Sequence, residues 1–501
     1  MSSMSFLRPQ DAAAQPLERT SRWLTAVMAV AAGLIVICFG VRLTVSWRNY
    51  GDLANEGGIW TTLALDANDG VLYRPLVSDL GYGGTRYGPL HVLLHAGLIR
   101  AGIPPVTGGF LIGVATAAAA MAGLFTLLRR LEVPASLAVL ILCFFLAAVC
   151  VRSGILSIKA DLLAAALDVW GLVAVVSAAD RPTARFSPAI PLAAVCFALA
   201  AMSKVTSIFG IVAATLWFLT RREKKRAVWL AAIYILCVLL AVLAVQWASQ
   251  GRAIAIFRAC GSAGGGLHRL TKAPPLFFQR IFLNDKAVGG FWTVAILLLL
   301  ARRKWTDLTT ILLIVTSLGT LAIFGSPGTD INHLIDLQMA SLLLVAVQFR
   351  SGRMARVVVP LVASVMVIHA AASSLGDVKR MLAEHRRREL DAALLDAGNS
   401  RVRGPLLTEN PVLPILAGNR PYMLDYVMFG VLDLKDPRFG QKLRDDLANQ
   451  RFRAVIIGPW LTQNAEPRAF NPWPEILERM KERYELRAVE YRTAIYLPKP
   501  R

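Results

Sequence analysis

Residues 49–101 have the sequence NYGDLANEGGIWTTLALDANDGVLYRPLVSDLGYGGTRYGPLHVLLHAGLIRA and lie between two strongly apolar segments. A connection between two membrane spans needs only a handful of residues, whereas this one is long and carries acids, aromatic residues and arginines. It also contains two apolar-periodic stretches, which begin at Glu56 and Pro89. We expect each to form a helix at the membrane surface. Because functional residues concentrate in loops held by a scaffold, we expect the chemistry here.

The composition indicates a polytopic α-helical membrane protein. Of the 501 residues, 55% are hydrophobic and 17% are charged, and the mean hydropathy is +0.53. A soluble protein carries about 25% charged residues. Repeated apolar runs are long enough to cross a bilayer core of about 30 Å. The net charge of +21 comes largely from Arg and Lys at span ends, so we expect no nucleic-acid partner.

The cysteines, the histidines and the N-terminus fit this class. The six cysteines show no CxxC or Cys/His spacing, which favours buried apolar residues over a disulfide framework or a zinc site. The histidines show no ligand spacing with carboxylates, so no metal site is indicated and no cofactor is expected, although the sequence leaves a requirement for a divalent metal open. Residues 1–22 are polar and basic, and the run 23–45 is too long for a cleaved signal peptide. We therefore expect a cytoplasmic tail followed by an uncleaved signal anchor.

The apolar runs and their flanking charges predict about eleven spans. These are 23–45, 108–128, 134–151, 161–179, a pair of short spans within 188–219, 227–247, 288–300, 308–324, 333–347 and 357–373. If the first span runs outward, every predicted inner loop carries basic residues, as the positive-inside rule requires. This orientation places the first outer loop (48–107) and the C-terminus outside the plasma (inner) membrane.

Three domains are expected: a cytoplasmic tail (1–22), a membrane domain (23–374) and a small extracytoplasmic α/β domain (375–501). In the last of these the composition becomes charged, and DPRFGQKLRDDLANQ is typical of a helix. FRAVIIG and TAIYLP are typical of strands, and Gly-Asn and Asn-Pro breaks separate these pieces. The length suffices for one small domain.

With this orientation, unusual polar residues gather at the outer mouths of the spans. They are Glu56 in the long loop, Lys159 and Asp161 at the entrance of the span 161–179, Lys204 in the turn within 188–219, and Asn332 and His333 at the start of the span 333–347. Charges within a membrane are costly and usually face a cavity or a partner. Their gathering on one side therefore indicates a site.

Transfer of a sugar from a lipid phosphate fits these residue types. A carboxylate is needed to activate the attacking hydroxyl or amine, and Glu56 or Asp161 fits that role. Cations are needed to hold the phosphate. The candidates for that role are Lys159, Lys204, Arg74 and Arg86.

Each candidate also has a structural explanation that the sequence leaves open. Glu56 can favour the start of a helix through the macrodipole. Lys159 and Asp161 can form an ion pair at the end of a span, and Lys204 can extend its ammonium to the interface. Tyr87 can belong to an interfacial aromatic belt instead of stacking on a sugar.

The order of the motifs resembles a known family. From the N-terminus the chain carries NEGGIW, LYRP and YGPLH, then KAD at 159–161, SK at 203–204 and DINHLIDL at 330–337. This series is similar to that of the GT-C glycosyltransferases, which use polyprenyl-phosphate sugars. The nearest kin would be bacterial relatives of the protein O-mannosyltransferases and the lipid A aminoarabinose transferase. The resemblance implies a GT-C-like fold, an inverting transfer and an extracytoplasmic active site.

The residues and the resemblance together give the expected site. Its catalytic residues are Glu56 and Asp161, and its contacts to donor phosphate or substrate are Lys159, Lys204, Arg74, Arg86, Tyr87, Asn332 and His333. The expected partners are a polyprenyl-phosphate sugar, the lipid bilayer and an extracytoplasmic lipid, glycan or protein acceptor. The chain departs from the family twice. The family's acidic pair maps onto Asn55-Glu56, and its Arg-x-Asp onto Lys159-Ala160-Asp161, which retains the charge but loses the bidentate fork.

Two other functions remain open. A polytopic transporter or lipid flippase of the cell envelope would show internal symmetry and broken helices with charges near the midplane. No such repeat is evident, and the charges favour one mouth. An inactive scaffold whose C-terminal domain binds a cell-envelope partner is a further alternative, to which the departure at Asn55 contributes.

Overall fold

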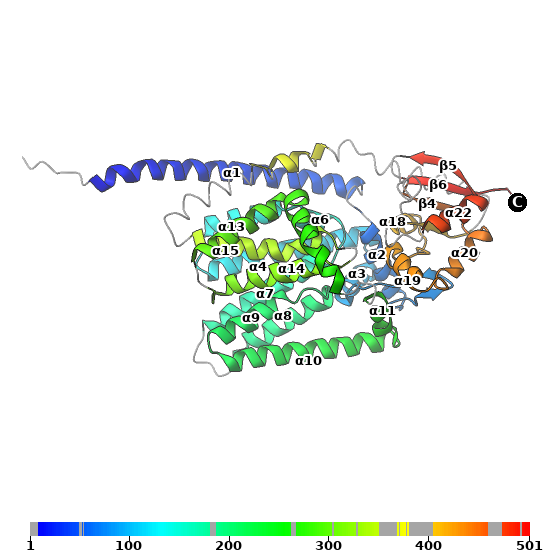
Figure 1. The fold of residues 1–501 in the computed structure, drawn as a ribbon, viewed down its shortest axis with the longest axis horizontal. Coiled ribbons are helices and arrows are strands. Elements are labelled where there is room, and N and C mark those ends of the chain that lie inside the picture. The colour runs from blue at the N-terminus through cyan, green and yellow to red at the C-terminus, as the bar shows by residue number, and fades with distance from the viewer. Residues whose placement is uncertain are drawn as a thin grey trace, which may run out of the picture.

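The computed structural model describes residues 9–49, 53, 55–180, 187–261, 267–302, 305–326, 329–349, 368–369, 371–376, 378–379, 404–458, 473–490 and 493–500. Most of these residues are helical, and a small sheet lies near the C-terminus (Figure 1). The long helices run roughly along one axis, and the sheet lies at one end of the molecule, beyond α2, α3 and α19.

The elements have the following bounds. The helices are α1 (Pro9–Asn49), α2 (Asn55–Asn68), α3 (Pro89–Arg100), α4 (Pro105–Arg130), α5 (Ala135–Ala147), α6 (Val149–Leu156), α7 (Asp161–Ala179), α8 (Ala189–Ser203), α9 (Phe209–Thr220), α10 (Lys224–Ala248), α11 (Arg252–Gly261), α12 (Ala273–Gln279), α13 (Lys286–Arg302), α14 (Leu308–Ile323), α15 (Ile335–Phe349), α18 (Val412–Leu416), α19 (Tyr426–Lys435), α20 (Gln441–Ala448) and α22 (Trp473–Arg483). Shorter helical turns are η2 (Leu267–Lys272), η3 (Arg280–Asn284) and η4 (Ile331–Leu334). The strands are β1 (Val77–Ser78), β2 (Gly81–Tyr82), β3 (Leu406–Thr408), β4 (Ala454–Ile457), β5 (Tyr484–Glu490) and β6 (Thr493–Pro498).

The chain is a multi-pass membrane protein. Within the described residues, five helices are long and apolar enough to cross a membrane, or seven if each of two bent helix pairs counts as one span. The first ten predicted spans all fall on helices, but α8, α9 and α14 are shorter than the roughly 20 residues that a bilayer core requires. The predicted count of eleven is therefore only partly confirmed. The eleventh span, 357–373, lies mostly outside the described residues.

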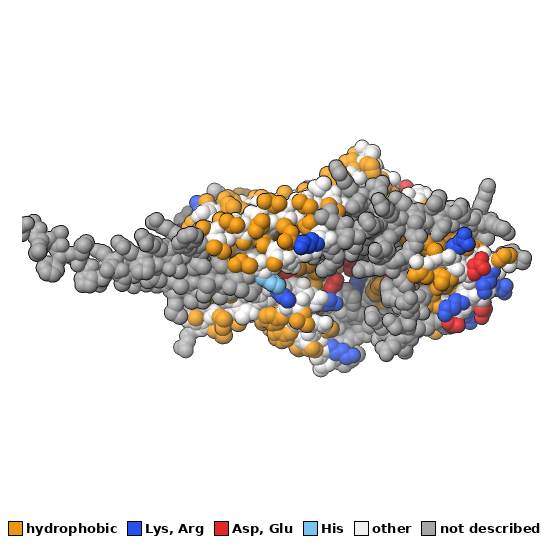
Figure 2. All heavy atoms as spheres, turned by 90° about the horizontal axis from the view of Figure 1, so that it is seen from above, with side chains coloured by type: hydrophobic (Ala, Val, Ile, Leu, Met, Phe, Trp, Pro, Cys, Tyr) orange, Lys and Arg blue, Asp and Glu red, His pale blue; other side chains and the backbone are white. Residues whose placement is uncertain are grey.

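The side chains at the surface fit an apolar membrane part and a more polar C-terminal end. Figure 2 shows hydrophobic side chains over much of the helical part of the visible face, while acidic and basic side chains gather at the end that holds the C-terminal sheet. In the apolar window of α7, 78% of the residues are buried, so α7 is a central helix. In that of α10 only 6% are buried, so most of α10 faces outward.

The predicted span 134–151 is not one straight helix. It is split into α5 and α6, which are bent by 72°. At the break the backbone of Ala148 is extended (φ −67°, ψ 134°). The buried carboxylate of Asp285 accepts a hydrogen bond from the backbone N–H of Cys150 at 2.8 Å, which satisfies the first turn of α6. The sequence predicts a span here but not its bend, because the bend depends on a distant residue.

The first outer loop forms the two helices that its periodicity predicts. These are α2 and α3, and a two-stranded hairpin of β1 and β2 lies between them. Gly57 and Gly58 allow α2 to pack closely on both sides. A Cβ at Gly57 would lie 2.7 Å from the carbonyl oxygen of Ser157, and one at Gly58 would lie 2.7 Å from the backbone nitrogen of Val412.

The C-terminal segment is the predicted small α/β unit. Its four-stranded sheet has the order β3-β4-β6-β5, with β3 parallel to β4 and the other pairs antiparallel. A buried cluster joins α18 and α19 to α2, α3 and α11. The segment therefore packs directly on the first outer loop. The expected boundary at 374/375 adjoins residues outside the described ranges and stays a prediction.

We predict that Gly88→Ala destabilises the protein. A Cβ at Gly88 would lie 2.1 Å from the carbonyl oxygen of Met202, and this backbone atom cannot move aside as a side chain could. The expected loss is about 1–3 kcal/mol, as for other overpacked sites. Thermal unfolding in detergent measures it. Gly97→Ala is the matched control, because nothing lies within 4 Å of that position in α3. Equal unfolding temperatures for the two variants would contradict the prediction.

Candidate functional site

Glu56 lies in the first turn of α2, where a carboxylate is favoured by the helix macrodipole. Its side chain is 33% exposed and forms an ion pair with the ammonium of Lys159, which is 8% exposed. Because Gly57 has no side chain, the start of α2 packs closely against the carbonyl oxygen of Ser157 in the 157–160 turn. Backbone packing therefore brings the two charges together.

The turn that carries Lys159 and Asp161 has an unusual backbone. Ile158, which is fully buried, has φ +51°, in the left-handed region that β-branched residues avoid. Such strained conformations cost about 1–3 kcal/mol and occur often at functional sites. Asp161 then begins α7 and is 7% exposed.

Asp161 is the centre of a second ion pair. The ammonium of Lys204 donates to its Oδ1 atom and also lies 3.4 Å from the carbonyl oxygen of Asn332. The side-chain amide of Asn332 donates to the same Oδ1 atom at 2.9 Å. Lys204 stands in the extended turn between α8 and α9, as the sequence predicts. Three segments distant in sequence therefore meet at one carboxylate.

The ammonium of Lys159 stays charged in this setting. Burial alone would lower the pKa of Lys159, but the carboxylates of Glu56 and Asp161 outweigh it and raise the pKa above its ordinary value. A permanent cation at this position suits a ligand that bears negative charge.

Arg86 and Tyr87 approach the same cluster from the loop before α3. The Tyr87 ring stacks on Trp60, with centroids 4.5 Å apart and planes inclined by 19°. Burial raises the pKa of Tyr87 well above its ordinary value, so its hydroxyl stays protonated. Arg86 lies within the range of charge interaction of both Tyr87 and His333. His333, in η4, is also within that range of Lys204.

Arg74 does not join this cluster. Its guanidinium forms two hydrogen bonds with the carboxylate of Asp66, at 2.7 and 2.8 Å, and a third with the carbonyl oxygen of Pro421 at 2.8 Å. The side chains of Arg74 and Asp66 are 1% and 5% exposed. This arginine links the first loop to the C-terminal segment, so we do not retain it as a phosphate contact.

We predict that Arg74→Met lowers the stability of the protein rather than its affinity for a phosphate. The substitution leaves the buried Asp66 carboxylate uncompensated, and breaking a buried ion pair costs about 3–5 kcal/mol. The expected result is a low yield of monodisperse protein and a lower unfolding temperature. A well-folded variant with weakened binding of undecaprenyl phosphate would instead return Arg74 to the site.

Sequence reasoning missed two neighbours of the cluster. Asp425, at the start of α19, lies within charge-interaction range of Glu56 and Arg86. Arg280 forms an ion pair with Asp330 at 3.3 Å, beside η4. Neither shows a local signal, because each reaches the site through contacts between remote segments.

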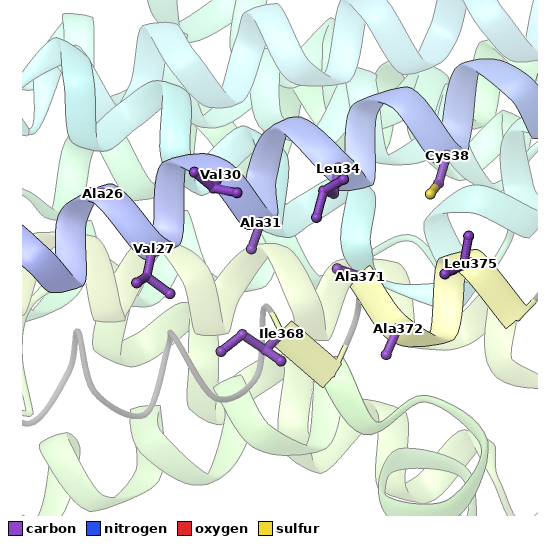
Figure 3. Close-up of a pocket in the computed structure, with 10 residues that line it drawn as sticks. All are labelled: Ala26, Val27, Val30, Ala31, Leu34, Cys38, Ile368, Ala371, Ala372 and Leu375. Atoms are coloured by element: carbon purple, nitrogen blue, oxygen red, sulfur yellow. The ribbon is translucent and has the colours of Figure 1, made fainter.

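No metal cluster is evident in the part of the chain that the structure describes, since no group of three or more His, Cys, Asp or Glu side chains there could hold an ion. An apolar cleft of about 510 Å³ lies between α1 and residues 368–375 (Figure 3). Its lining consists of Ala, Val, Leu, Ile and Cys side chains only. It offers no group for a phosphate and is separate from the cluster around Asp161.

Comparison with known proteins finds similarity in structure only. No family model and no curated protein sequence match the chain. ArnT from Cupriavidus metallidurans bound to undecaprenyl phosphate is 12% identical, with a TM-score of 0.60 over 96% of this chain and 100% of that chain. The Archaeoglobus fulgidus oligosaccharyltransferase with Zn and sulfate is 14% identical, with a TM-score of 0.56 over 93% and 73%. The oligosaccharyltransferase AglB from the same organism, with an inhibitory peptide and a dolichol-phosphate, is 14% identical, with a TM-score of 0.53 over 88% and 70%. The chain therefore has the GT-C-like fold that the motifs predict.

Proposed function

We propose that this protein is a membrane glycosyltransferase that moves a sugar from a polyprenyl-phosphate donor to an extracytoplasmic lipid, glycan or protein acceptor. The main observation is the meeting of two carboxylate–lysine pairs, Glu56 with Lys159 and Asp161 with Lys204, at one place in a GT-C-like fold. The two lysines offer positive charge for a phosphate, and the two acids offer a base.

In the proposed step Glu56 is the base. Its carboxylate takes the proton of the acceptor O–H or N–H as the acceptor atom attacks the sugar carbon that bears the phosphate. The bond from that carbon to the phosphate oxygen breaks, and the polyprenyl phosphate leaves with the bonding electrons. Lys159 and Lys204 stabilise the charge of the leaving phosphate, and Arg86 lies close enough to add to this field.

The two ion pairs link the binding of the donor to the activation of the base. Without a donor, Lys159 neutralises Glu56 and Lys204 neutralises Asp161. A donor phosphate competes for both ammonium groups, so its binding makes the Glu56 carboxylate a better proton acceptor. Asp161 would then position the acceptor or donor. Asn332, whose amide donates a hydrogen bond to Asp161, and His333 would keep the residues around Asp161 in place.

The similar structures support the donor class. One contains undecaprenyl phosphate and another a dolichol-phosphate, and both have the same fold as this chain. Lipid phosphates of this class carry the charge that the two lysines match. Exposure of the site and of the C-terminal segment on the outer side of the plasma membrane is part of the proposal. A reporter fused to the C-terminus tests it, and a cytoplasmic signal would overturn the orientation.

Transfer from a panel of radiolabelled polyprenyl-phosphate sugars, in membranes that overexpress the chain, tests the function. We expect label to appear in an acceptor with one donor of the panel and not in control membranes. Absence of transfer from every donor would overturn the proposal.

A lipid flippase or transporter is the second candidate. The observation that favours it is the presence of two bent helix pairs, since broken helices are common in transporters. One pair is α5 with α6, and the other is Leu270–Asn284 with Lys286–Ala301. Movement of a fluorescent polyprenyl phosphate across proteoliposomes without chemical change would support that function instead.

A further inference from the structure

Asp425 is brought to the site by backbone pairing between remote segments. The backbone N–H of Tyr82 donates to the carbonyl oxygen of Tyr422 at 2.7 Å, and that of Leu424 donates to the carbonyl oxygen of Tyr82 at 3.0 Å. Gly81 permits this approach: it has φ +113°, and a Cβ there would lie 2.0 Å from the Tyr422 carbonyl oxygen. The residue after Leu424 is therefore held beside the loop that carries Arg86.

The side chain of Asp425 has a fixed direction. Its Oδ1 atom accepts hydrogen bonds from the backbone N–H groups of Val427 at 2.9 Å and Met428 at 3.1 Å, so it caps the start of α19. The residue is only 6% exposed. A capping carboxylate in this position can turn only slightly, which suits a group that must meet a ligand in one geometry.

The charges around Asp425 are those of the site. Within charge-interaction range lie Glu56 from α2, Arg86 and Tyr87 from the loop before α3, and the Cys260 thiol from α11. Burial raises the pKa of Asp425 to about 6, a shift that Glu56 increases and that the capping N–H groups and Arg86 reduce. A carboxyl that ionises near neutral pH can serve in proton transfer.

Asp425 differs from the two other acids. Glu56 is paired with Lys159, and Asp161 is paired with Lys204. A donor phosphate must therefore draw those lysines away before either carboxylate can act on the acceptor. Within the described part of the chain, the hydrogen bonds that Asp425 accepts come instead from the backbone of its own helix. Donor binding therefore does not have to release the charge of Asp425 from either of those two lysines.

We propose that Asp425 is a third carboxylate of the site and binds the hydroxyl or ammonium group of the acceptor. The acceptor would then enter along the C-terminal segment, while the lipid donor enters from the membrane. This inference rests on the proposed function and adds to it the position and the chemistry of the acceptor.

The test is Asp425→Asn. Asn caps a helix about as well as Asp, so α19 should be retained while the charge is removed. The probe for the donor side is undecaprenyl phosphate. Those for the acceptor side are octylamine and octyl glucoside, which present an ammonium and a hydroxyl group as competitors of transfer. We expect transfer to fall at least about tenfold, the inhibitory concentration of the acceptor probes to rise similarly, and the affinity for undecaprenyl phosphate and the unfolding temperature to stay unchanged.

The pH profile provides a readout that a capping role would not change. The ionised form of Asp425 is the binding form, so the wild-type rate should fall as pH drops through about 6, and this limb should be absent in the variant.

Asp436→Asn is the matched control, because Asp436 is an exposed acid after α19 that pairs with Arg438, and it should behave as wild type. Wild-type transfer and an unchanged pH limb in Asp425→Asn would overturn the inference. A fall in unfolding temperature equal to that of Asp425→Ala would also overturn it, in favour of a cap alone. Failure of the wild-type chain to transfer from any donor would overturn the proposed function itself.

Discussion

Glu56→Gln should abolish sugar transfer while the chain is still expressed and inserted in the membrane. The amide has the size of the carboxylate but cannot accept the proton of the attacking acceptor. General-base catalysis contributes about 10²–10⁴-fold to a rate, so a loss of that size is expected. Transfer of radiolabel in membranes, normalised to the amount of protein, measures it.

The control for this substitution must separate chemistry from stability. Gln leaves Lys159, whose side chain is 8% exposed, without its nearest carboxylate, although Asp161 remains in range. The double variant Glu56→Gln/Lys159→Gln removes both charges and should regain the unfolding temperature without regaining transfer. Glu478→Gln makes the same change at a side chain that is 74% exposed and should be neutral. Full activity of Glu56→Gln would remove Glu56 from the proposed role.

The elements of the site that local sequence encodes were predicted from the sequence. Apolar periodicity predicted α2 and α3, and the apolar break at Lys204 predicted the turn between α8 and α9. The positive-inside rule placed the polar residues of the outer span ends on one side of the membrane. It could do so because the basic residues at the end of each span indicate the orientation of that span. The structure brings Glu56, Asp161 and their two lysines together, although their catalytic roles stay predictions.

The parts that were missed depend on contacts between remote residues. The bend between α5 and α6 is held by Asp285, 135 positions from its partner Cys150. Arg74 was predicted to contact the donor phosphate, but its position depends on Asp66 and on the carbonyl oxygen of Pro421 in the C-terminal segment. Asp425 reaches the site from the opposite end of the chain. Periodicity reports which face of a helix is apolar and carries no information on such pairings.

Lys204→Met should weaken the binding of undecaprenyl phosphate to the purified protein. The substitution retains most of the apolar stem of the side chain and removes the ammonium. A hydrogen bond to a charged group is worth about 1.5–3 kcal/mol, which corresponds to a roughly 10- to 150-fold higher Kd. Titration of the detergent-solubilised protein with undecaprenyl phosphate measures it. Lys442→Met, a partly exposed lysine paired with Asp446 in the C-terminal segment, is the control and should leave the Kd unchanged.

The buried partner of Lys204 allows binding to be distinguished from folding. Without the ammonium, the Asp161 carboxylate retains only the hydrogen bond from the Asn332 amide among those described, so Lys204→Met should also lower the unfolding temperature. Asp161→Asn combined with Lys204→Met removes both charges, which should recover stability but not affinity for the phosphate. If the double variant bound undecaprenyl phosphate as tightly as wild type, Lys204 would be a structural partner of Asp161, and the donor phosphate would have to depend on Lys159 and Arg86 instead.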